Sequence, residues 1–236
     1  MEKSISMIKK KFIIFFLLCL SCSSDDIVHS EKTSLYNIYK NLIVKEQEPI
    51  ISNVSRKEIS NDRKWLSKFK QPIILLTSSD SKSQATLVAL GNNKNKLTWV
   101  SSDGISVSFE DGILIATRGY SQDLMESEHG DLKNFFNLSS KNREKTYRYL
   151  NGQNEYEELK FSCSISAKKN TTSKILDLNL KTTELTEICE SENSSHTNLY
   201  YLLPNTKIVL KSKQWISESN GYIICYNYYA FQSNVF

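Results

Sequence analysis

The sequence is poor in glycine and proline, and it has no long uninterrupted apolar segment. Among its 236 residues are seven glycines and three prolines, and they form no Gly- or Pro-rich linker of the kind that separates domains. The longest apolar run is the nine residues Phe12–Leu20, whereas a helix that spans a bilayer needs about 20. We also find no internal repeat. These absences predict one domain, over residues 35–236, and they exclude a permanent helical span in the apolar run.

A strong excess of charge is also missing. The formal net charge is +4, but residues 1–21 hold four lysines and one glutamate, so the remainder is close to neutral at +1. A nucleic-acid-binding protein needs a basic surface that covers its contact with the nucleic acid. The nearly neutral charge therefore excludes nucleic acid as a partner. Hydrophobic content of 39% and charged content of 24% are typical of a globular chain with a buried core.

Motifs for cofactors and metals are absent. The chain has no Gly-rich phosphate loop, no GxSxG and no CxxC or Cys/His spacing for zinc. Its three histidines, His29, His129 and His196, have no partner at metal-binding spacing, and we predict that each is solvated at the surface. We therefore predict no metal, no cofactor and no catalytic residue.

Two pairs of carboxylates leave one enzymatic alternative open. Glu126 with Glu128, and Glu184 with Glu187, could serve as acid and base in a glycan-modifying enzyme. Sequence proximity does not establish such a site, and solvated charges are the ordinary interpretation.

The N-terminus has the organisation of a secretory signal. Lysines precede the apolar run, and small residues follow it. Leu20-Ser21-Cys22 resembles the end of a bacterial lipobox, although Cys19 occupies the position where the box usually has leucine. We predict a signal peptide over 1–21, lipidation of Cys22 and a tether over 22–34. Ser23 after the cysteine favours the outer membrane. The alternative is an ordinary signal peptide that contains cysteines.

Three cysteines remain beyond the signal, in a compartment that permits disulfides. Phe161, Cys163 and Ile165 alternate on one face of a strand-like segment, and Cys189 follows a similar segment. We predict a Cys163–Cys189 disulfide. Cys225 lies among aromatic residues, and we expect a buried, inert thiol.

The pattern of the chain indicates β structure after one short helix. Apolar residues from Leu35 to Ile43 have helical spacing. Short strands are indicated at 72–77 and 85–90. Between Leu97 and Met125, two Asp-Gly turns eight residues apart predict three successive antiparallel strands. The alternation returns at Leu176, Leu178 and Leu180, and again toward the C-terminus. We predict a mainly β fold, an antiparallel meander that forms an open or incomplete barrel.

Two stretches contain candidate functional residues. Arg118 ends a predicted buried strand and Asp123 follows it; this arginine could hold an acidic polymer, or the two residues could pair and fix the loop. Gln214 and Trp215 combine hydrogen-bonding groups with an aromatic ring, as sugar-binding surfaces do, although burial of Trp215 in the core is equally consistent. We take these four residues as the candidate polysaccharide or partner surface.

The same stretches resemble the YjbF/GfcB lipoprotein family. The resemblance rests on short motifs in the family's order, and it runs from about Leu35 to Tyr222; the matching segments are Trp99, Ser102–Gly104, Gly112–Gly119, Asp123–Met125, Tyr147–Asn151, Ser212–Ile216 and Gly221-Tyr222. Cys163 with Cys189 also matches a cysteine pair of the family. Asn151 and Lys213 depart from the family's usual aspartate and arginine.

The resemblance implies a function as well as a fold. Such lipoproteins are encoded with exopolysaccharide or group 4 capsule genes, and their fold is a predominantly antiparallel, incomplete barrel. We therefore expect a non-catalytic lipoprotein on the periplasmic face of the outer membrane, anchored through acyl chains, palmitate among them, on Cys22. Its expected partners are the membrane and an extracellular polysaccharide, export-machinery proteins, or both. The alternatives are the glycan-modifying enzyme and a structural envelope lipoprotein.

Overall fold

The computed structural model describes residues 63–80, 83–93, 95–130, 135–136, 142–150 and 155–232. These residues all belong to one compact unit, Tyr39–Phe236. The predicted signal peptide, Cys22, the tether and the helix at 35–43 lie outside the described residues.

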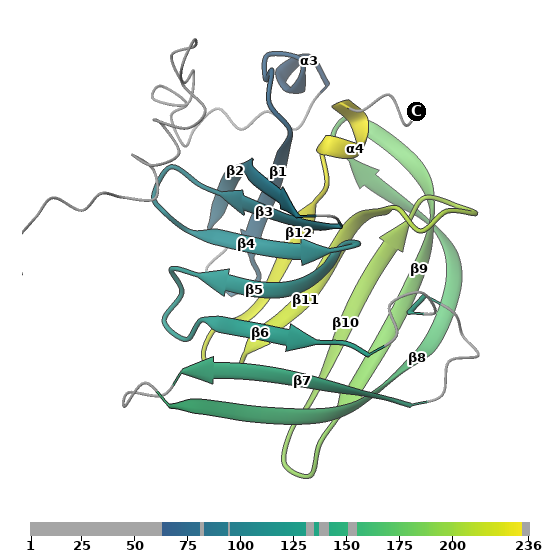
Figure 1. The fold of residues 1–236 in the computed structure, drawn as a ribbon. Coiled ribbons are helices and arrows are strands. Elements are labelled where there is room, and N and C mark those ends of the chain that lie inside the picture. Colours follow the sequence, from purple (N-terminus) through teal and green to yellow (C-terminus); the bar gives the residue numbers. More distant parts are fainter. Residues whose placement is uncertain are drawn as a thin grey trace, which may run out of the picture. The chain divides into compact units, whose positions relative to one another are not determined.

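The described chain is almost entirely β (Figure 1). Its elements are, in order, α3 (Arg63–Leu66), β1 (Ile73–Ser78), β2 (Gln84–Asn93), β3 (Lys96–Val100), β4 (Ser106–Glu110), β5 (Ile113–Arg118), β6 (Leu124–Glu128), β7 (Arg143–Leu150), β8 (Tyr156–Ile175), β9 (Leu178–Glu190), β10 (Ser195–Leu202), β11 (Val209–Ser217), β12 (Gly221–Tyr226) and α4 (Tyr229–Gln232).

The predicted Asp-Gly turns make the β3–β4–β5 meander. At the second turn, Asp111 and Gly112 both have positive φ, 50° and 86°, as a two-residue type I′ hairpin requires. At the first turn Gly104 has a φ of 88°, and its N–H donates to Ser101 O at 3.2 Å. The prediction of three successive antiparallel strands is confirmed.

All twelve strands form one antiparallel sheet, in the order β5-β4-β3-β2-β1-β12-β11-β10-β9-β8-β7-β6. Strands that follow one another in the chain are neighbours in the sheet, except at one place. β5 and β6 are consecutive but occupy the two edges of the sheet, while β1 and β12, from opposite ends of the described chain, pair in its middle. The sheet is a nearly closed barrel with an unsealed seam between β5 and β6, which confirms the predicted incomplete barrel.

The alternation at Leu176, Leu178 and Leu180 does not mark a single strand. Leu176 has a φ of 55° and lies with Asp177 in the turn between β8 and β9. The apolar pattern continues through this turn because Leu176 itself is buried, at 3% exposure. A prediction from periodicity alone therefore assigned one strand to residues that include the turn between β8 and β9.

Two clusters of buried side chains fill the interior of the barrel. The larger joins β1–β7 to β8, β9, β11 and β12 and includes Trp99, Tyr147, Phe161 and Trp215. The smaller lies around Tyr200. Burying aromatic side chains of this size stabilises a core strongly, so the interior of this barrel is packed over much of its length.

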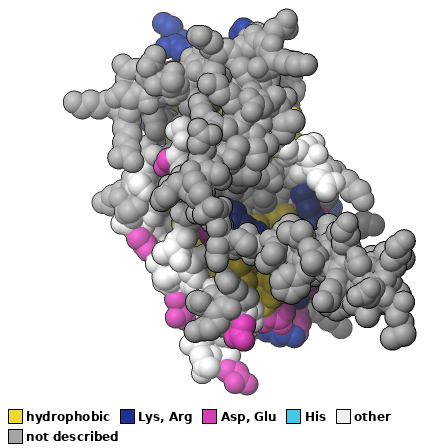
Figure 2. Space-filling view, turned by 60° about the vertical axis from the view of Figure 1, so that its left-hand side comes forward, with side chains coloured by type: hydrophobic (Ala, Val, Ile, Leu, Met, Phe, Trp, Pro, Cys, Tyr) yellow, Lys and Arg dark blue, Asp and Glu magenta, His cyan; other side chains and the backbone are white. Residues whose placement is uncertain are grey.

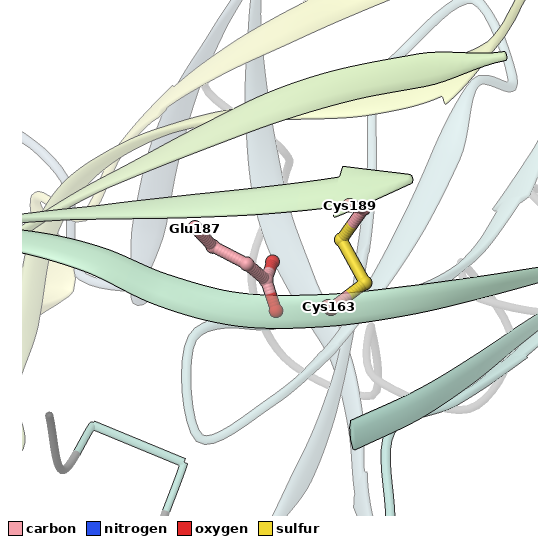
Figure 3. Close-up of side chains that lie close together, drawn as sticks. All are labelled: Cys163, Glu187 and Cys189. Atoms are coloured by element: carbon pink, nitrogen blue, oxygen red, sulfur yellow. A yellow bond between two sulfur atoms is a disulfide. The ribbon is translucent and has the colours of Figure 1, made fainter. Parts of the chain in front are cut away.

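The disulfide lies inside this packing. Cys163 and Cys189 are directly opposite each other in β8 and β9, and they are joined by a disulfide, which confirms the prediction (Figure 3). Figure 3 also shows the carboxylate of Glu187 beside the bridge. Because the two sulfurs are bonded to each other, the grouping offers no thiolate ligand to a metal ion.

Cys225 is a free, buried cysteine. Burial raises the pKa of its thiol to about 12. The expectation of a buried, inert thiol is therefore confirmed, because the reactive form of cysteine is the thiolate.

Candidate functional site

The seam between β5 and β6 is bridged by side chains. Leu124 N donates to Thr117 Oγ1 at 3.0 Å, and the Thr117 hydroxyl donates to Asp123 Oδ1 at 3.1 Å. Asp123 also accepts from the backbone N–H groups of Gly119, at 2.9 Å, and Tyr120, at 3.1 Å. Asp123 thus organises the short loop that connects the two edge strands.

Arg118 completes this arrangement. Its guanidinium donates to the carbonyl oxygens of Leu124, at 3.1 Å, and Met125, at 3.5 Å, and to that of Thr117. Edge strands present unpaired backbone groups. The arginine guanidinium has five N–H donors, so it can bond several carbonyl oxygens at once. Arg118 therefore satisfies carbonyls of β6 that have no neighbouring strand on this side.

Gln214 covers the start of the same edge from inside the barrel. Its Nε2 donates to Gly112 O at 2.9 Å, and its Oε1 accepts from Leu114 N at 2.8 Å. These are the two backbone groups that a neighbouring strand would engage, so the carboxamide of Gln214 replaces a peptide unit. Gly112 permits the close approach of β11, because a Cβ added there would lie 2.7 Å from Val209 Cβ.

Trp215 is also directed inward. It is 6% exposed, and its ring stacks on His196 at 4.4 Å between centroids with an interplanar angle of 12°. Tyr147 and Phe161 contact the same ring edge to face. Consecutive residues of a strand normally face opposite sides, but Gln214 and Trp215 both contact interior residues. The register of β11 with β12 shifts just after them, between Trp215 and Ser217.

The structure thus brings the predicted site residues to one part of the molecule, but in structural positions. The loop at Arg118 and Asp123 also contacts the turn after β11, where the Asn220 Nδ2 donates to Gln122 O at 2.7 Å. Among the described ion pairs, Arg118 and Asp123 do not pair with each other; each bonds the backbone instead. Gln214 and Trp215 lie in the interior, not on a surface, and contact of any of the four with polymer remains a prediction.

A buried polar network lies further inside the barrel. Glu187 is fully buried, and its Oε2 accepts from Asn198 Nδ2 at 2.8 Å, Tyr200 OH at 3.1 Å and Lys145 Nζ at 3.3 Å. Its Oε1 accepts from Arg143 at 3.4 Å. A buried charge is tolerated only when it is paired and hydrogen-bonded in this way.

The electrostatics of the network follow from burial and from its basic residues. Burial raises the pKa of Glu187, but the charge of Lys145 and the hydrogen bond from Asn198 outweigh it and hold the pKa below the ordinary value. Burial lowers the pKa of Lys145 against the opposing effect of Glu187. The carboxylate is therefore the stable form of Glu187 inside the barrel.

The prediction of solvated histidines is wrong for the two that are described. His129 and His196 are 5% and 4% exposed. Burial, with the positive charge of Lys145, lowers the pKa of His129 well below its ordinary value and that of His196 to about 3. Both rings are therefore neutral near pH 7, and His196 Nε2 shares a hydrogen bond of 3.1 Å with Tyr147 OH.

A cavity of about 820 Å³ opens at the end of the barrel beside α4. We call it the mouth cavity. Trp99, Phe109 and Tyr229 give it an aromatic lining, and its polar lining comes chiefly from asparagine and charged side chains, namely Asn92, Asn95, Glu110, Asp111, Lys207, Lys211 and Asn227. An apolar cavity with a few convergent polar groups is the usual form of a ligand site.

The polar lining of the mouth cavity is held in place. Asn95 Nδ2 donates to Glu110 Oε1 at 2.9 Å and to Asp111 Oδ2 at 3.3 Å. Trp99 and Tyr229 have ring centroids 6.2 Å apart. Figure 2 shows one face of the molecule, where hydrophobic side chains lie in a hollow with basic and acidic side chains at its margins. This is the same mixture of side chains that lines the mouth cavity.

The carboxylate pairs of the enzymatic alternative are engaged elsewhere. Glu126 and Glu128 each accept from Arg148 Nη1 at 2.6 Å, and the hydrogen bond from Arg148 lowers the pKa of Glu128. Glu184 pairs with Lys169 at 2.9 Å, whereas Glu187 belongs to the buried network. Glu184 lines a described cavity, but Glu126, Glu128 and Glu187 line none of the described cavities, so neither pair flanks one of them as an acid and a base would.

Sequence reasoning missed the buried network and the mouth cavity. One signal was available, because Arg143, Lys145, Tyr147 and Tyr149 alternate and share one face of β7. When basic residues occupy the same strand face as buried aromatic residues, we expect them to be buried too and to pair with an acidic residue. The cavity had no such signal, because its lining comes from strands far apart in the sequence.

Comparison with known proteins places the chain in a family. Residues 41–225 match the family described as "Group 4 capsule polysaccharide lipoprotein gfcB, YjbF". No curated protein matches the chain. Among the described helices, none combines the length and the hydropathy that crossing a bilayer requires.

One solved structure shows the same fold. It is the crystal structure of the hypothetical lipoprotein YmcC from Escherichia coli (K12), which is 12% identical, with a TM-score of 0.57, over 76% of this chain and 95% of that chain.

These observations define a single-sheet, nearly closed barrel with a packed interior and a cavity at one end. Because the family match spans more than half of the chain, the protein belongs to the YjbF group 4 capsule polysaccharide lipoprotein family. The resemblance predicted from the sequence is confirmed.

Proposed function

We propose that this protein is an outer-membrane lipoprotein, anchored on the periplasmic face through Cys22, that supports export or assembly of an extracellular or capsular polysaccharide. It acts without catalysis, by binding the polymer or proteins of the export machinery. The family match over residues 41–225 is the observation that carries this proposal.

The mouth cavity is the proposed binding site. Aromatic rings with amide and carboxylate groups at their margins suit sugars, which present apolar faces and a rim of hydroxyl groups. Trp99 and Tyr229 supply such rings, and Asn92, Asn95 and Glu110 line the same cavity. Arg118, Asp123 and Gln214 would then act indirectly, because they hold the strands that form its wall.

The anchor determines where this site works. Several acyl chains on one cysteine hold a protein to a membrane far better than one chain, at about 0.8 kcal/mol per buried methylene. A protein without them would diffuse away from the membrane through which polymer leaves the cell.

The proposal is tested in a strain from which the gene has been deleted. Secreted and cell-bound polysaccharide is measured with the native gene, with Cys22→Ala or with no gene restored. Loss of polymer that only the native gene restores is the expected result. An unchanged amount and chain length of polymer in the deletion strain would contradict the proposal, and longer chains would indicate the glycan-modifying enzyme.

The cavity is tested separately with two exposed tyrosines. Tyr229 lines the mouth cavity and is 36% exposed, whereas Tyr156 is 67% exposed and lines none of the described cavities. We expect Tyr229→Ala, but not Tyr156→Ala, to lower retention of purified polymer by the full-length protein in detergent. Equal retention by both variants would remove the mouth cavity as the site.

A further inference from the structure

The hairpin of β8 and β9 extends beyond its neighbours in the sheet. β8 pairs with β9 as far as Ile175↔Leu178. In the described chain, however, β7 pairs with β8 only as far as Cys163, and β10 pairs with β9 only from Thr183 onward. The last residues of the hairpin therefore have no strand beside them in the described sheet. Its tip is nevertheless held against the molecule, because Ile175 and Leu176 are buried and Asp177 pairs with Arg63 of α3 at 3.1 Å.

A bulge decides which residues of this part of the hairpin face inward. The register shifts between Ile165 and Ala167, so the inward face of β8 passes from Cys163 and Ile165 to Lys168 and Asn170. Lys168 is opposite the buried Leu185. The inner surface of the barrel thus continues along the hairpin, but its character changes from apolar to basic and hydroxylated.

A cavity of about 810 Å³ lies against this surface. We call it the hairpin pocket. Three of its lining side chains are lysines, Lys168, Lys181 and Lys207, and most others are threonine or asparagine; no described lining residue is acidic. Phe136 and Lys207 line both this pocket and the mouth cavity, so the two cavities adjoin.

The two lysines that the hairpin contributes to this pocket, Lys168 and Lys181, share one face of the hairpin. Lys169, next to Lys168, points to the other face and pairs with Glu184 at 2.9 Å. Within the described residues, neither Lys168 nor Lys181 forms an ion pair. A concave surface lined by charge of one sign concentrates ligands of the opposite sign.

We propose that the hairpin pocket binds an acidic segment of a polysaccharide, sugar units that carry carboxylate groups, while the continuing chain enters the mouth cavity. This inference rests on the proposed function and adds the class of polymer. Lys168 and Lys181 attract the carboxylates, and the threonine and asparagine side chains offer hydrogen bonds to hydroxyl groups.

The test compares two oligosaccharides with the same sugar backbone, one with free carboxylates and one with neutral methyl esters. Oligogalacturonate and its methyl ester are titrated into the full-length protein in detergent at two salt concentrations. We expect oligogalacturonate to bind more tightly at low salt and the ester to show little salt dependence. The double variant Lys168→Gln/Lys181→Gln should weaken oligogalacturonate binding about fivefold, because it removes two exposed charge pairs, each of which contributes modestly. Lys169→Gln is the matched control and should bind like the native protein.

Three outcomes would overturn the inference. The first is equal affinity for the two oligosaccharides, and the second is an equal loss in the control and the double variant. The third is selective binding of vesicles with anionic lipid, lost in the double variant, with no binding of oligogalacturonate. If the deletion strain loses polymer and the double variant restores it fully, the inference fails while the proposed function stands.

Discussion

Two junctions of the barrel, β1 with β12 and β5 with β6, are held together by different means. Between β1 and β12, residues from opposite ends of the described chain form a regular backbone ladder, with Leu75 opposite Tyr226 and Ser78 opposite Ile223. Between β5 and β6, strands separated by a five-residue loop form no ladder, and Thr117, Arg118 and Asp123 bridge them with side-chain hydrogen bonds.

The difference shows that proximity in sequence and pairing in the sheet are separate matters. A backbone ladder uses groups that every residue except proline has, so it tolerates many side chains. A seam that only side chains bridge depends on the identity of a few residues. Substitutions that conserve shape should therefore be tolerated between β1 and β12 and costly between β5 and β6.

The largest effect is expected at Gln214. Gln214→Leu keeps the approximate volume but leaves Leu114 N and Gly112 O buried without their partners, and each such group costs about 1–3 kcal/mol. We expect the free energy of unfolding to fall by about 4 kcal/mol, measured by urea denaturation. A loss below about 1 kcal/mol would show that the edge of β5 does not need its side-chain cap.

The disulfide between β8 and β9 joins neither pair of strands compared above, so its removal serves as a reference for a global loss of stability. Cys163 and Cys189 are 26 residues apart in sequence, and removing a cross-link over such a loop costs about 3 kcal/mol. We expect the Cys163→Ala/Cys189→Ala variant to lose this stability globally. Hydrogen exchange at Leu124 N should then rise only as far as global stability falls; a larger, local increase would mean that the disulfide supports the seam.

A matched pair of threonines compares the two junctions directly. Thr117→Val removes the acceptor of Leu124 N and should cost about 2 kcal/mol. Thr77, on β1 opposite Ile224, has a buried hydroxyl without a hydrogen-bond partner. Thr77→Val should therefore be neutral or slightly stabilising. Thermal unfolding of both variants decides the matter, and equal losses would remove the distinction between ladder and seam.

The smallest effect on the free energy of unfolding is expected from mild acid, through the buried His196. The pKa of His196 is about 3 in the folded protein against about 6.5 in an unfolded chain. Below pH 6.5 the unfolded state therefore takes up a proton that the folded state does not, and stability falls with pH until about pH 3. We expect a loss of about 1 kcal/mol between pH 7.5 and 5.5 from this residue, with His129 acting in the same direction.

The variant His196→Gln isolates this contribution. Urea denaturation at the two pH values should give a smaller difference for the variant than for the native protein. Glu187 does not interfere, because its stabilising effect is lost only below the pKa of an unfolded glutamate, about 4.3. An identical pH dependence in both proteins would show that His196 does not titrate between the two states.

Local features of the fold could be predicted from the sequence. The Asp-Gly turns gave the β3–β4–β5 meander because adjacent positive φ values suit few other residue pairs. Alternation around Cys163 and Cys189 placed both cysteines on buried faces, and the pairing followed. The family resemblance supplied the class of fold and the capsule association, which composition alone does not contain.

The candidate site was predictable only in part. Arg118, Asp123 and Gln214 were singled out by their sequence context, and they do lie together, but as supports of the seam. Gln214 and Trp215 are consecutive in β11, yet both contact interior residues, which breaks the alternation that sequence reasoning assumes. His129 and His196 looked solvated because their neighbours in sequence are polar.

By itself, the sequence determined where the chain turns, which faces of its strands are apolar and which cysteines pair, because these depend on residues near one another in the chain. Only the tertiary structure decided that β1 pairs with β12, that β5 and β6 do not pair, and that the long β8–β9 hairpin presents a basic surface. Those outcomes depend on bulges and on hydrogen bonds between distant strands. An alternation of period two specifies a buried face, but not the strand against which it packs.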